Sequence, residues 1–518
     1  MNGAEALIQT LSDCGVEVCF ANPGTSEMQL VAALDKQPKV RAILGLFEGV
    51  VTGAADGYGR MTDKPAATLL HLGPGLGNGL SNLHNAKRAR TPIVNIVGDH
   101  AVDHRKYDAP LTSDVAAVAR PMSDWVRTST SPDDLAIAGA EAAQAALVYP
   151  GQIATLIAPA DHAWTDGAHP VPPKNPPGSA TASARDVADA AAALGAGGSA
   201  ALFLGGRALR EAALQQAGRI AAATGARLIS ETFSARLQRG AGRVAVERLP
   251  YFGEMASEFL DGLTRIVFVG AEPPVSFFAY PGKPSWLSPE GAKLIKLAGP
   301  RVDAVDALRQ LADALNAPAA PADLQAPAMP PAADGKLDAQ SLGAVLASLL
   351  PENAIISDEA ATAGLAIFPM TQGAAKHDWL MLTGGSIGQG LPLAAGAAVA
   401  CPERKVIALQ ADGSAMYTVQ ALWTMAREDL DVTTVIINNG SYAILNIELA
   451  RVGVVDPGPI ALSLLDLTRP AIDWVSISEG LGVPAVRADT VEGFREALGE
   501  ALGTKGPRLV EAVVPAGI

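Results

Sequence analysis

The sequence contains little cysteine: only Cys14, Cys19 and Cys401 among 518 residues. Three cysteines cannot form a disulfide framework, and none of them has the spacing of a metal site. Basic residues are also outnumbered, with 39 Lys and Arg against 53 Asp and Glu, which gives a net charge of −14. Because nucleic-acid binding needs clustered basic residues, we expect no nucleic-acid partner.

Long apolar runs are missing as well. The run from Leu391 to Cys401 is too short to span a bilayer and is rich in small residues. The first residues, MNGAEALIQTLSDCG, have the pattern of a short amphipathic helix with acidic side chains rather than of a secretory signal. We therefore expect a cytoplasmic protein without a membrane partner.

The sequence does contain enough apolar residues, 49% of the total, for several hydrophobic cores. Its length alone predicts three to four domains. Two stretches rich in Pro and Ala, 165–182 and 317–336, have few large apolar residues and are predicted to be extended linkers. We therefore expect three domains, at residues 1–164, 183–316 and 335–518.

Short β-branched runs alternate with helical stretches in all three segments; examples are PIVNIVGD, SAALFLGG and KVIALQAD. Runs that are apolar throughout are typical of strands buried on both faces of a parallel sheet. Helices between such strands imply right-handed crossover connections. The sequence therefore predicts an α/β fold with three domains, each a parallel sheet flanked by helices. In such sheets, ligands bind at the carboxyl ends of the strands.

Polar residues end two consecutive strands of the last segment. KVIALQ is followed by Ala-Asp412-Gly413-Ser414, and a helix is expected from about Tyr417 to Glu428; the next strand ends in Asn-Asn439-Gly-Ser441. Asp412 and Asn439 are 27 positions apart, about one βαβ repeat, so they are expected at the same sheet edge. The oxygens of Asp412 and Asn439 and the carbonyl of Ser441 suit Mg²⁺, and Gly413 lets a phosphate approach the backbone. The alternative is a helix cap and a turn-forming Asn-Gly pair.

A glycine-rich turn, TGGSIG at residues 383–388, precedes a helix of small residues. Such a turn presents backbone N–H and C=O groups to a ligand. The alternative is a tight turn that serves only helix packing.

The Asp-Gly-Ser motif at 412–414, together with the Asn-Asn pair at 438–439, resembles the cofactor motif of thiamine-diphosphate enzymes. The whole chain is similar to the group of that family that contains benzoylformate decarboxylase and the catalytic subunit of acetolactate synthase. The family usually has Gly before the Asp, where this sequence has Ala411. The resemblance implies pyrimidine-binding, central and diphosphate-binding domains in this order, with thiamine diphosphate and Mg²⁺ as cofactors. It implies a homodimer at minimum, because the cofactor lies between two subunits, and favours a homotetramer.

The resemblance also implies roles for individual residues. In LGLFEGVVTGAADGYGR, Glu48 matches the glutamate that protonates the aminopyrimidine ring of the cofactor; the alternative is a first-turn Glu facing the helix dipole. Ile387 matches the large apolar residue that bends the cofactor into its V shape. The further cofactor contacts implied are Thr362, Gly384, Gly385, Ser386, Asp412, Gly413, Ser414, Asn439, Ser441 and Tyr442.

His71, in LLHLGPGLGN, matches the histidine that relays protons in benzoylformate decarboxylase; the alternative is a capping or core histidine. Thr25, in the loop NPGTSE, stands where that enzyme presents a serine to the substrate carboxylate. We therefore expect Glu48, His71 and Thr25 to be catalytic. The substrate pocket is expected to include Asn22, Gly24, Leu445 and Phe278.

Two features of the family pattern are absent. The segment PPVSFFAYPGKP has no histidine, although benzoylformate decarboxylase brings a second catalytic histidine there; Ala279 or its neighbours occupy that region. An intermediate that is not protonated quickly can attack a second carbonyl, which gives carboligation. The central segment also lacks an extended Gly-rich and Arg pattern, so we expect no FAD.

The expected function is that of a 2-oxo acid decarboxylase or carboligase, a lyase or transferase that depends on thiamine diphosphate and Mg²⁺. The resemblance implies an enamine after CO₂ loss, which is released as an aldehyde or joined to a second carbonyl. Alternatives are an acetolactate synthase-like transferase, a 2-hydroxyacyl-CoA lyase, and, outside enzymes, a cofactor-binding regulatory subunit. The intact Glu48 argues against the last.

Overall fold

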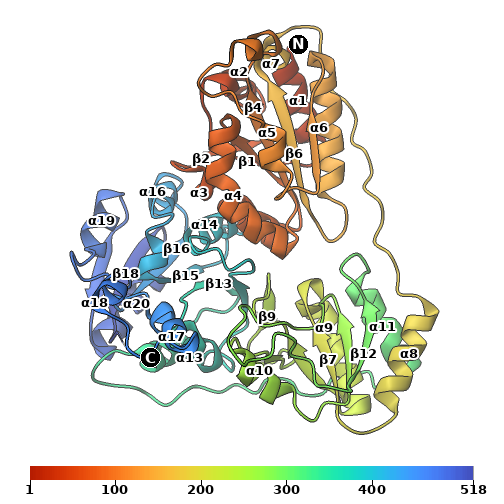
Figure 1. Cartoon of the computed structure of the whole chain (residues 1–518), viewed down its shortest axis with the longest axis vertical. Helices are drawn as coiled ribbons and strands as arrows, with labels where there is room; N and C mark the ends of the chain where they lie inside the picture. Colours follow the sequence, from red (N-terminus) through yellow and green to blue (C-terminus); the bar gives the residue numbers. More distant parts are fainter. Residues whose placement is uncertain (517–518) are drawn as a thin grey trace.

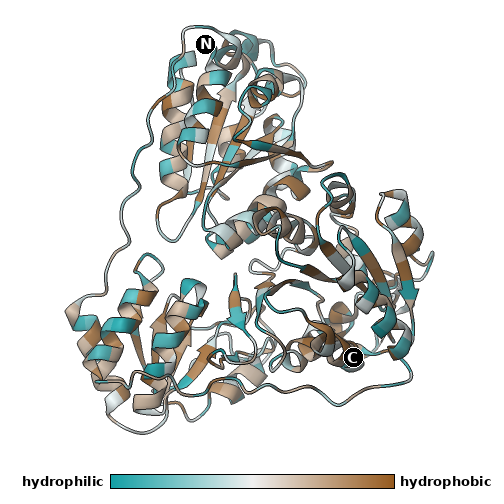
Figure 2. Ribbon diagram, turned by 180° about the vertical axis from the view of Figure 1, so that it is seen from behind, coloured by the Kyte–Doolittle hydropathy of each residue, from teal (hydrophilic) through white to brown (hydrophobic). Residues whose placement is uncertain are grey.

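The computed structural model describes residues 1–516, which form three α/β domains (Figure 1). Each domain has its own sheet, and all strands pair in parallel apart from one edge strand. The predicted fold class is thus confirmed. Figure 2 shows that hydrophobic residues are concentrated in the strands, as expected for sheets covered on both faces by helices.

The first sheet has six parallel strands in the order β2-β1-β3-β4-β6-β5. They are β1 (Val18–Asn22), β2 (Arg41–Leu44), β3 (Ala66–Leu70), β4 (Ile93–Asp99), β5 (Trp125–Thr128) and β6 (Ile153–Pro159). The helices are α1 (Gly3–Asp13), η1 (Thr25–Glu27), α2 (Met28–Asp35), α3 (Glu48–Thr62), α4 (Leu72–Ala89), η2 (Val102–Tyr107), α5 (Val115–Ala119), α6 (Pro132–Ala146) and α7 (Ala160–Trp164). The three strands β3, β4 and β6 are buried along their whole length.

The second sheet has five parallel strands in the order β10-β8-β7-β11-β12. They are β7 (Ala200–Leu204), β8 (Arg227–Ser230), β10 (Glu247–Arg248), β11 (Arg265–Val269) and β12 (Lys293–Ala298). The helices are α8 (Ala184–Gly195), η3 (Gly206–Leu209), α9 (Glu211–Thr224), α10 (Gly253–Leu260) and α11 (Ala304–Ala314).

The third sheet has the order β17-β18-β16-β15-β13-β14-β9. Its strands are β9 (Leu237–Arg239), β13 (Ala354–Glu359), β14 (His377–Met381), β15 (Val406–Ala411), β16 (Val432–Asn438), β17 (Ala485–Ala488) and β18 (Arg508–Val513). Its helices are α12 (Ala339–Leu349), α13 (Gly364–Met370), α14 (Gly390–Ala400), α15 (Asp412–Ala415), α16 (Ala421–Arg427), α17 (Ala443–Arg451), α18 (Pro459–Ser463), α19 (Trp474–Gly480) and α20 (Val491–Gly503).

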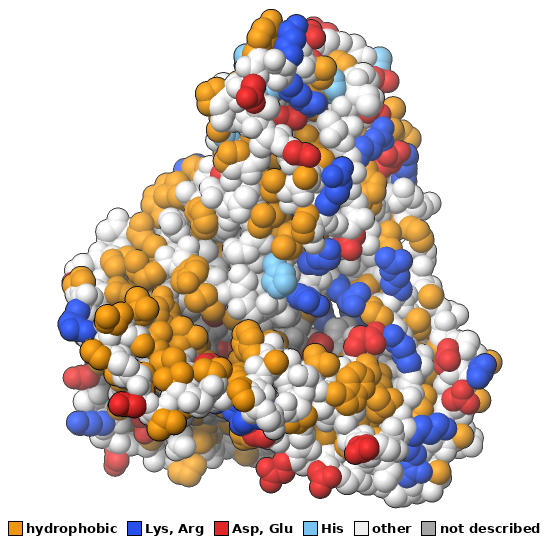
Figure 3. All heavy atoms as spheres, viewed as in Figure 1, with side chains coloured by type: hydrophobic (Ala, Val, Ile, Leu, Met, Phe, Trp, Pro, Cys, Tyr) orange, Lys and Arg blue, Asp and Glu red, His pale blue; other side chains and the backbone are white. Residues whose placement is uncertain are grey.

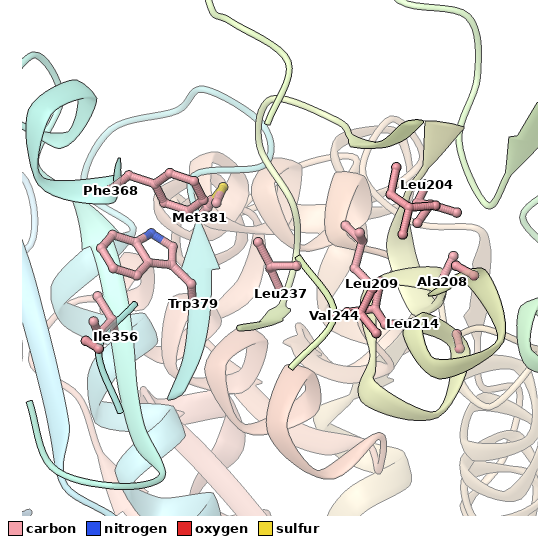
Figure 4. Packing of buried hydrophobic residues seen from close by; sticks show 14 of the residues in the cluster. Leu204, Ala208, Leu209, Leu214, Leu237, Val244, Ile356, Phe368, Trp379 and Met381 are labelled. Atoms are coloured by element: carbon pink, nitrogen blue, oxygen red, sulfur yellow. The ribbon is translucent and has the colours of Figure 1, made fainter. Parts of the chain in front are cut away.

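Strand β9 ties the second and third domains together. It lies in the middle of the chain between β8 and β10, yet it pairs antiparallel with β14 of the third sheet, with Leu237 opposite Trp379. Figure 4 shows Leu237 between an aromatic group that includes Trp379 and the leucines of the second domain. The two domains therefore share one hydrophobic core.

The first and third domains meet where α3 packs on α14 (Figure 1). A Cβ at Gly396 would lie 1.8 Å from the carbonyl oxygen of Ala54, and one at Gly57 would lie 2.1 Å from that of Leu393. The two helix backbones are therefore in direct contact, which only glycine allows at these positions. Arg60, on the same face of α3, donates to the carbonyl of Met381 at 2.8 Å.

Residues 165–182 connect α7 to α8 without forming a helix, and they run along the outside of the molecule (Figure 1). Across residues 1–516, none of the helices is both long enough and apolar enough to cross a bilayer.

Candidate cofactor and active site

Asp412 lies at the carboxyl end of β15, beside the turn that follows β16. The two strands pair up to Ala411 opposite Ile437, so both predicted motifs reach the same edge of the third sheet. Asp412 is only 2% exposed. Its Oδ1 accepts the N–H of Gly413 and its Oδ2 accepts that of Gly440, each at 2.8 Å. The carboxylate is therefore fixed against the 438–441 turn, as the 27-residue spacing predicted.

The chemistry of this edge suits a divalent cation. Burial raises the pKa of Asp412, and backbone N–H groups oppose that rise. Within the described residues no Lys, Arg or His forms an ion pair with Asp412, so its buried charge has no protein cation to neutralise it. Asn439 and Ser441 stand in the adjacent turn, where the Oδ1 of Asn439 accepts the N–H of Ser441 at 3.0 Å. A carboxylate, an amide oxygen and carbonyl oxygens are the ligands that Mg²⁺ prefers.

The helix expected at about Tyr417–Glu428 is shorter and starts later. A single turn, α15, begins at Asp412, and α16 begins only at Ala421. Between them Thr418 donates its hydroxyl to the carbonyl of Gly388 at 2.9 Å, which ties the break to the glycine-rich turn. Local helix propensity cannot predict a hydrogen bond of this kind, which joins a side chain to a distant segment.

Gly413 is required by packing. A Cβ there would lie 2.4 Å from the ring of Tyr442 and 3.0 Å from Leu467. The predicted cofactor residue Tyr442 thus lies over Gly413. Ser414 is buried next to it, and its Oγ accepts the Nε2 of Gln410 at 2.8 Å. Thr362, the other residue expected near the diphosphate, is buried just after β13.

The glycine-rich turn at 383–388 leads from β14 into α14, and Glu359 at the end of β13 supports it. The carboxylate of Glu359 accepts the backbone N–H groups of Gly388 and Gly390, and the Nε2 of Gln410 at 3.0 Å. Glu359 is fully buried, which raises its pKa to about 7. Sequence reasoning missed this residue; its signal is an acidic residue that ends an apolar strand.

Helix α4 of the first domain holds the other side of the same turn. Asn85 donates to the carbonyl of Ser386 at 2.7 Å and accepts its N–H at 3.2 Å. The Nε2 of His84 lies 3.1 Å from the carbonyl of Gly384, and Asn82 donates to that of Gly388 at 3.1 Å. Sequence reasoning also missed these residues. The backbone on both sides of Ile387 is therefore fixed by side chains from two domains.

Glu48 begins α3 and lies at the carboxyl edge of the first sheet. It is buried, and its Oε2 accepts the Nδ2 of Asn78 at 3.0 Å. A Cβ at Gly75 would lie 2.9 Å from Oε1 of Glu48 and 3.3 Å from Cβ of His71. The structure thus places two of the predicted catalytic residues next to the same position of Gly75.

His71 caps α4 and contacts the loop that carries Thr25. Its Nδ1 lies 2.7 Å from Oε2 of Glu27, and its ring fills the space beside Gly24. Asn22 donates to the carbonyl of Gly45 at 2.8 Å, which fixes the start of the loop.

Thr25 is exposed. It lines a cavity of about 540 Å³ together with residues of η1, α2, η2 and α7 and of the segment after β4; among these are Ser26, Met28, His100, His104, Tyr107 and Trp164.

Leu445 and Phe278 are the two predicted pocket residues outside the first domain. Both are largely exposed, at 45% and 59%. The loop of Phe278 is tied to the helix of Leu445, because the hydroxyl of Tyr280 donates to Glu448 at 2.6 Å. No hydrogen bond between described residues joins this loop or this helix to His71 or Thr25.

Family models match both ends of the chain. The model described as "Thiamine pyrophosphate enzyme, N-terminal TPP binding domain" matches residues 1–118. The model described as "Thiamine pyrophosphate enzyme, C-terminal TPP binding domain" matches residues 365–512. The first region contains Glu48 and His71, and the second contains the Asp412 and Asn439 motifs.

Whole-length relatives agree with these matches. The chain is 56% identical over 516 residues to a Mycobacterium tuberculosis protein, IlvX, named after the large subunit of acetolactate synthase, with 99% of each chain covered. It is 29% identical over 530 residues to benzoylformate decarboxylase of Pseudomonas aeruginosa, with 96% of each covered. A solved thiamine diphosphate-dependent 4-hydroxybenzoylformate decarboxylase of Rhodococcus jostii superposes with a TM-score of 0.85 at 25% identity, over 99% of each chain.

Proposed function

The chain belongs to the thiamine pyrophosphate enzymes, and on that premise we propose that it removes CO₂ from a small 2-oxo acid, with Glu48 and His71 as its acid–base residues. Related enzymes are named for both decarboxylation and acetolactate synthesis. The observation that supports the proposal is that Glu48 and His71 both lie beside Gly75, at the carboxyl edge of the first sheet.

The residues of the third domain fit the cofactor. Asp412, Asn439 and the carbonyl of Ser441 would hold Mg²⁺, and the turn fixed by Glu359 and Asn85 would present Ile387 to the cofactor. When bound, thiamine diphosphate supplies a carbon nucleophile and the electron sink that accepts the electron pair left by CO₂.

The protein's own part is to hold and move protons. Glu48, steadied by Asn78, would exchange a proton with the aminopyrimidine ring through its carboxylate. His71, with Nδ1 engaged by Glu27, would carry a proton to or from the substrate oxygen through Nε2. Thr25 would donate its hydroxyl to the substrate carboxylate from the exposed end of its loop.

Carboligation is favoured as the second candidate outcome by the loop that contains Phe278. Its aromatic residues are Phe277, Phe278 and Tyr280, and it contains no histidine. This loop therefore offers no second imidazole to return a proton after CO₂ loss, and ligation to a second carbonyl would compete with aldehyde release.

We also propose a homodimer as the smallest active unit, and a homotetramer as the state in solution. Two observations support this. Glu48 and Asp412 lie on separate domains with no hydrogen bond between them in the described part of the chain. Large apolar side chains are exposed around α18, with Val455 at 96%, Ile460 at 79% and Leu464 at 74%, and Figure 3 shows hydrophobic side chains gathered on this domain.

Product analysis tests the proposed reaction. The purified protein with thiamine diphosphate and Mg²⁺ is given benzoylformate or pyruvate, and CO₂, aldehyde and ligated products are measured. Benzaldehyde indicates the decarboxylase and acetolactate the ligase. Absence of CO₂ release from a panel of aliphatic and aromatic 2-oxo acids would overturn the proposal. Sedimentation velocity tests the assembly: a monomer at active concentrations would contradict it.

A further inference from the structure

Glu27 is the buried acidic side chain that contacts His71. We propose that Glu27 is a positioning residue that holds His71 with its proton on Nδ1, so that Nε2 faces the substrate as the nitrogen that accepts and returns a proton. The inference rests on the proposed function, because it concerns the same His71.

The contact geometry assigns the tautomer. Oε2 of Glu27 lies 2.7 Å from Nδ1 of His71 and also accepts the N–H of Gly24 at 2.7 Å. With Glu27 ionised, its carboxylate has no proton to give, so Oε2 accepts from both Gly24 and His71 and Nδ1 is the donor. The hydrogen bond made by one ring nitrogen sets the state of the other. Nε2 of His71 is therefore the basic nitrogen, and no hydrogen bond within the described residues occupies it.

The side chains of Glu27 and His71 fill the space beside two glycines of the surrounding backbone. A Cβ at Gly98 would lie 1.6 Å from Oε1 of Glu27, and a Cβ at Gly24 would lie 2.3 Å from Nδ1 of His71. Gly98 is in β4 and Gly24 is in the loop after β1, so two separate segments lack side chains around the pair. Glu27 and His71 thus lie at the same edge of the first sheet as Glu48.

Glu27 is costly to bury. It has no exposed surface, and its Oε1 has no hydrogen-bond partner among the described residues. Burial raises the pKa of Glu27, while the hydrogen bonds from Gly24 and His71 lower it. A buried carboxyl group with one unsatisfied oxygen destabilises a fold, and such groups are concentrated at functional sites.

A purely structural role is the competing explanation, because Glu27 also caps the short helix η1 through Gly24. The two explanations predict different results for Glu27→Met, which keeps the length of the side chain and removes its oxygens. If Glu27 only caps η1, the variant loses stability and the state of His71 does not change. If Glu27 positions His71, the ring loses its fixed tautomer and kcat falls even where the protein stays folded.

The first experiment is NMR on the cofactor-free protein labelled with ¹⁵N-histidine. The chain has seven histidines, and the signal of His71 is identified by its loss in His71→Gln. The wild type is expected to show the neutral ring of His71 with its proton on Nδ1. In Glu27→Met the proton is expected to move mainly to Nε2. An Nδ1-protonated ring in both proteins would overturn the proposal.

The second experiment is a kinetic cycle on the holoenzyme with Glu27→Met, His71→Gln and the double variant. We expect Glu27→Met to lower kcat roughly 100-fold with little change in KM, in the range of acid–base catalysis. The double variant should be no slower than His71→Gln, because Glu27 acts only through His71. If the loss of kcat in the double variant equals the product of the losses in the two single variants, the residues act independently and the proposal is overturned.

Glu17→Met is the matched control, since Glu17 is an acidic residue of the same domain that pairs with Lys64 at the surface. It should leave kcat and the His71 signal unchanged. The two levels of inference fail separately: a wild type without activity on any 2-oxo acid contradicts the proposed function, whereas an active Glu27→Met enzyme with normal kcat contradicts only the role of Glu27.

Discussion

The carboxylate of Glu359 accepts the backbone N–H of Gly388, the residue that follows Ile387. This bond crosses from the end of β13 to the start of α14, and its acceptor is fully buried. A carboxyl group whose oxygens accept the free N–H groups at a helix N-terminus fixes the direction of the turn that precedes the helix. The position of Ile387 therefore depends on an ionisable group.

Replacing Glu359 should change how stability depends on pH. Its pKa of about 7 in the folded protein is above the ordinary value of 4.5, so folding favours the protonated form. The wild type therefore loses stability as pH rises from about 4.5 to 7, whereas Glu359→Gln, which has the shape of the protonated form, does not. The difference should approach roughly 3 kcal/mol, taking about 1.4 kcal/mol for each unit between the two pKa values.

Urea denaturation of both proteins at about pH 5 and pH 8 measures this difference. The free energy of unfolding of the wild type relative to Glu359→Gln should be lower at pH 8. A constant difference across the range would show that Glu359 titrates normally, contrary to its burial.

Asp412→Ala should abolish the stabilisation that thiamine diphosphate and Mg²⁺ give the folded protein. A ligand at 100 times its Kd raises the free energy of unfolding by about 2.7 kcal/mol. Thermal unfolding with and without cofactor measures the gain. We expect a rise in Tm for the wild type and none for the variant. Asp489→Ala, at an exposed position of the same domain, serves as control and should retain the rise; loss in both variants would argue against a metal role for Asp412.

The contact between α3 and α14 should not tolerate a methyl group. Gly396→Ala places a Cβ 1.8 Å from the carbonyl oxygen of Ala54, so the helices must separate, at a cost of roughly 1–3 kcal/mol. Gly499→Ala, in α20 with no atom near its Cβ position, should instead stabilise the fold by about 1 kcal/mol. Chemical denaturation of the two variants gives the comparison, and equal effects would contradict the close approach of α3 and α14.

Asn85→Ala should weaken cofactor binding more than it weakens folding. Asn85 makes two hydrogen bonds to Ser386, so its loss frees one side of the glycine-rich turn. Calorimetric titration with thiamine diphosphate and Mg²⁺ should show a Kd roughly 10-fold higher, the loss expected from about 1.4 kcal/mol. An unchanged Kd in a folded variant would show that α4 does not support the cofactor turn.

The sequence was sufficient wherever the argument was local or periodic. The distance of 27 residues between Asp412 and Asn439 placed both at one sheet edge, because parallel strands joined by a helix end on the same side. Contacts between segments far apart in the chain could not be predicted from the sequence. The pairing of β9 with β14, and the bonds from Asn85 to Ser386, join residues far apart in the chain and leave no periodic pattern. The late start of α16 has the same cause, since Thr418 bonds to Gly388.

Proton exchange at C2 of the thiazolium ring of bound thiamine diphosphate is the most direct test of the role of Glu48. The exchange is followed by NMR after dilution into D₂O, with wild type and Glu48→Gln saturated with cofactor and Mg²⁺. We predict that the wild type exchanges roughly 100-fold or more faster than the variant, in the range of acid–base catalysis by a positioned carboxyl group. Equal rates in the two proteins would contradict the account, because Glu48 would then have no part in generating the reactive carbon.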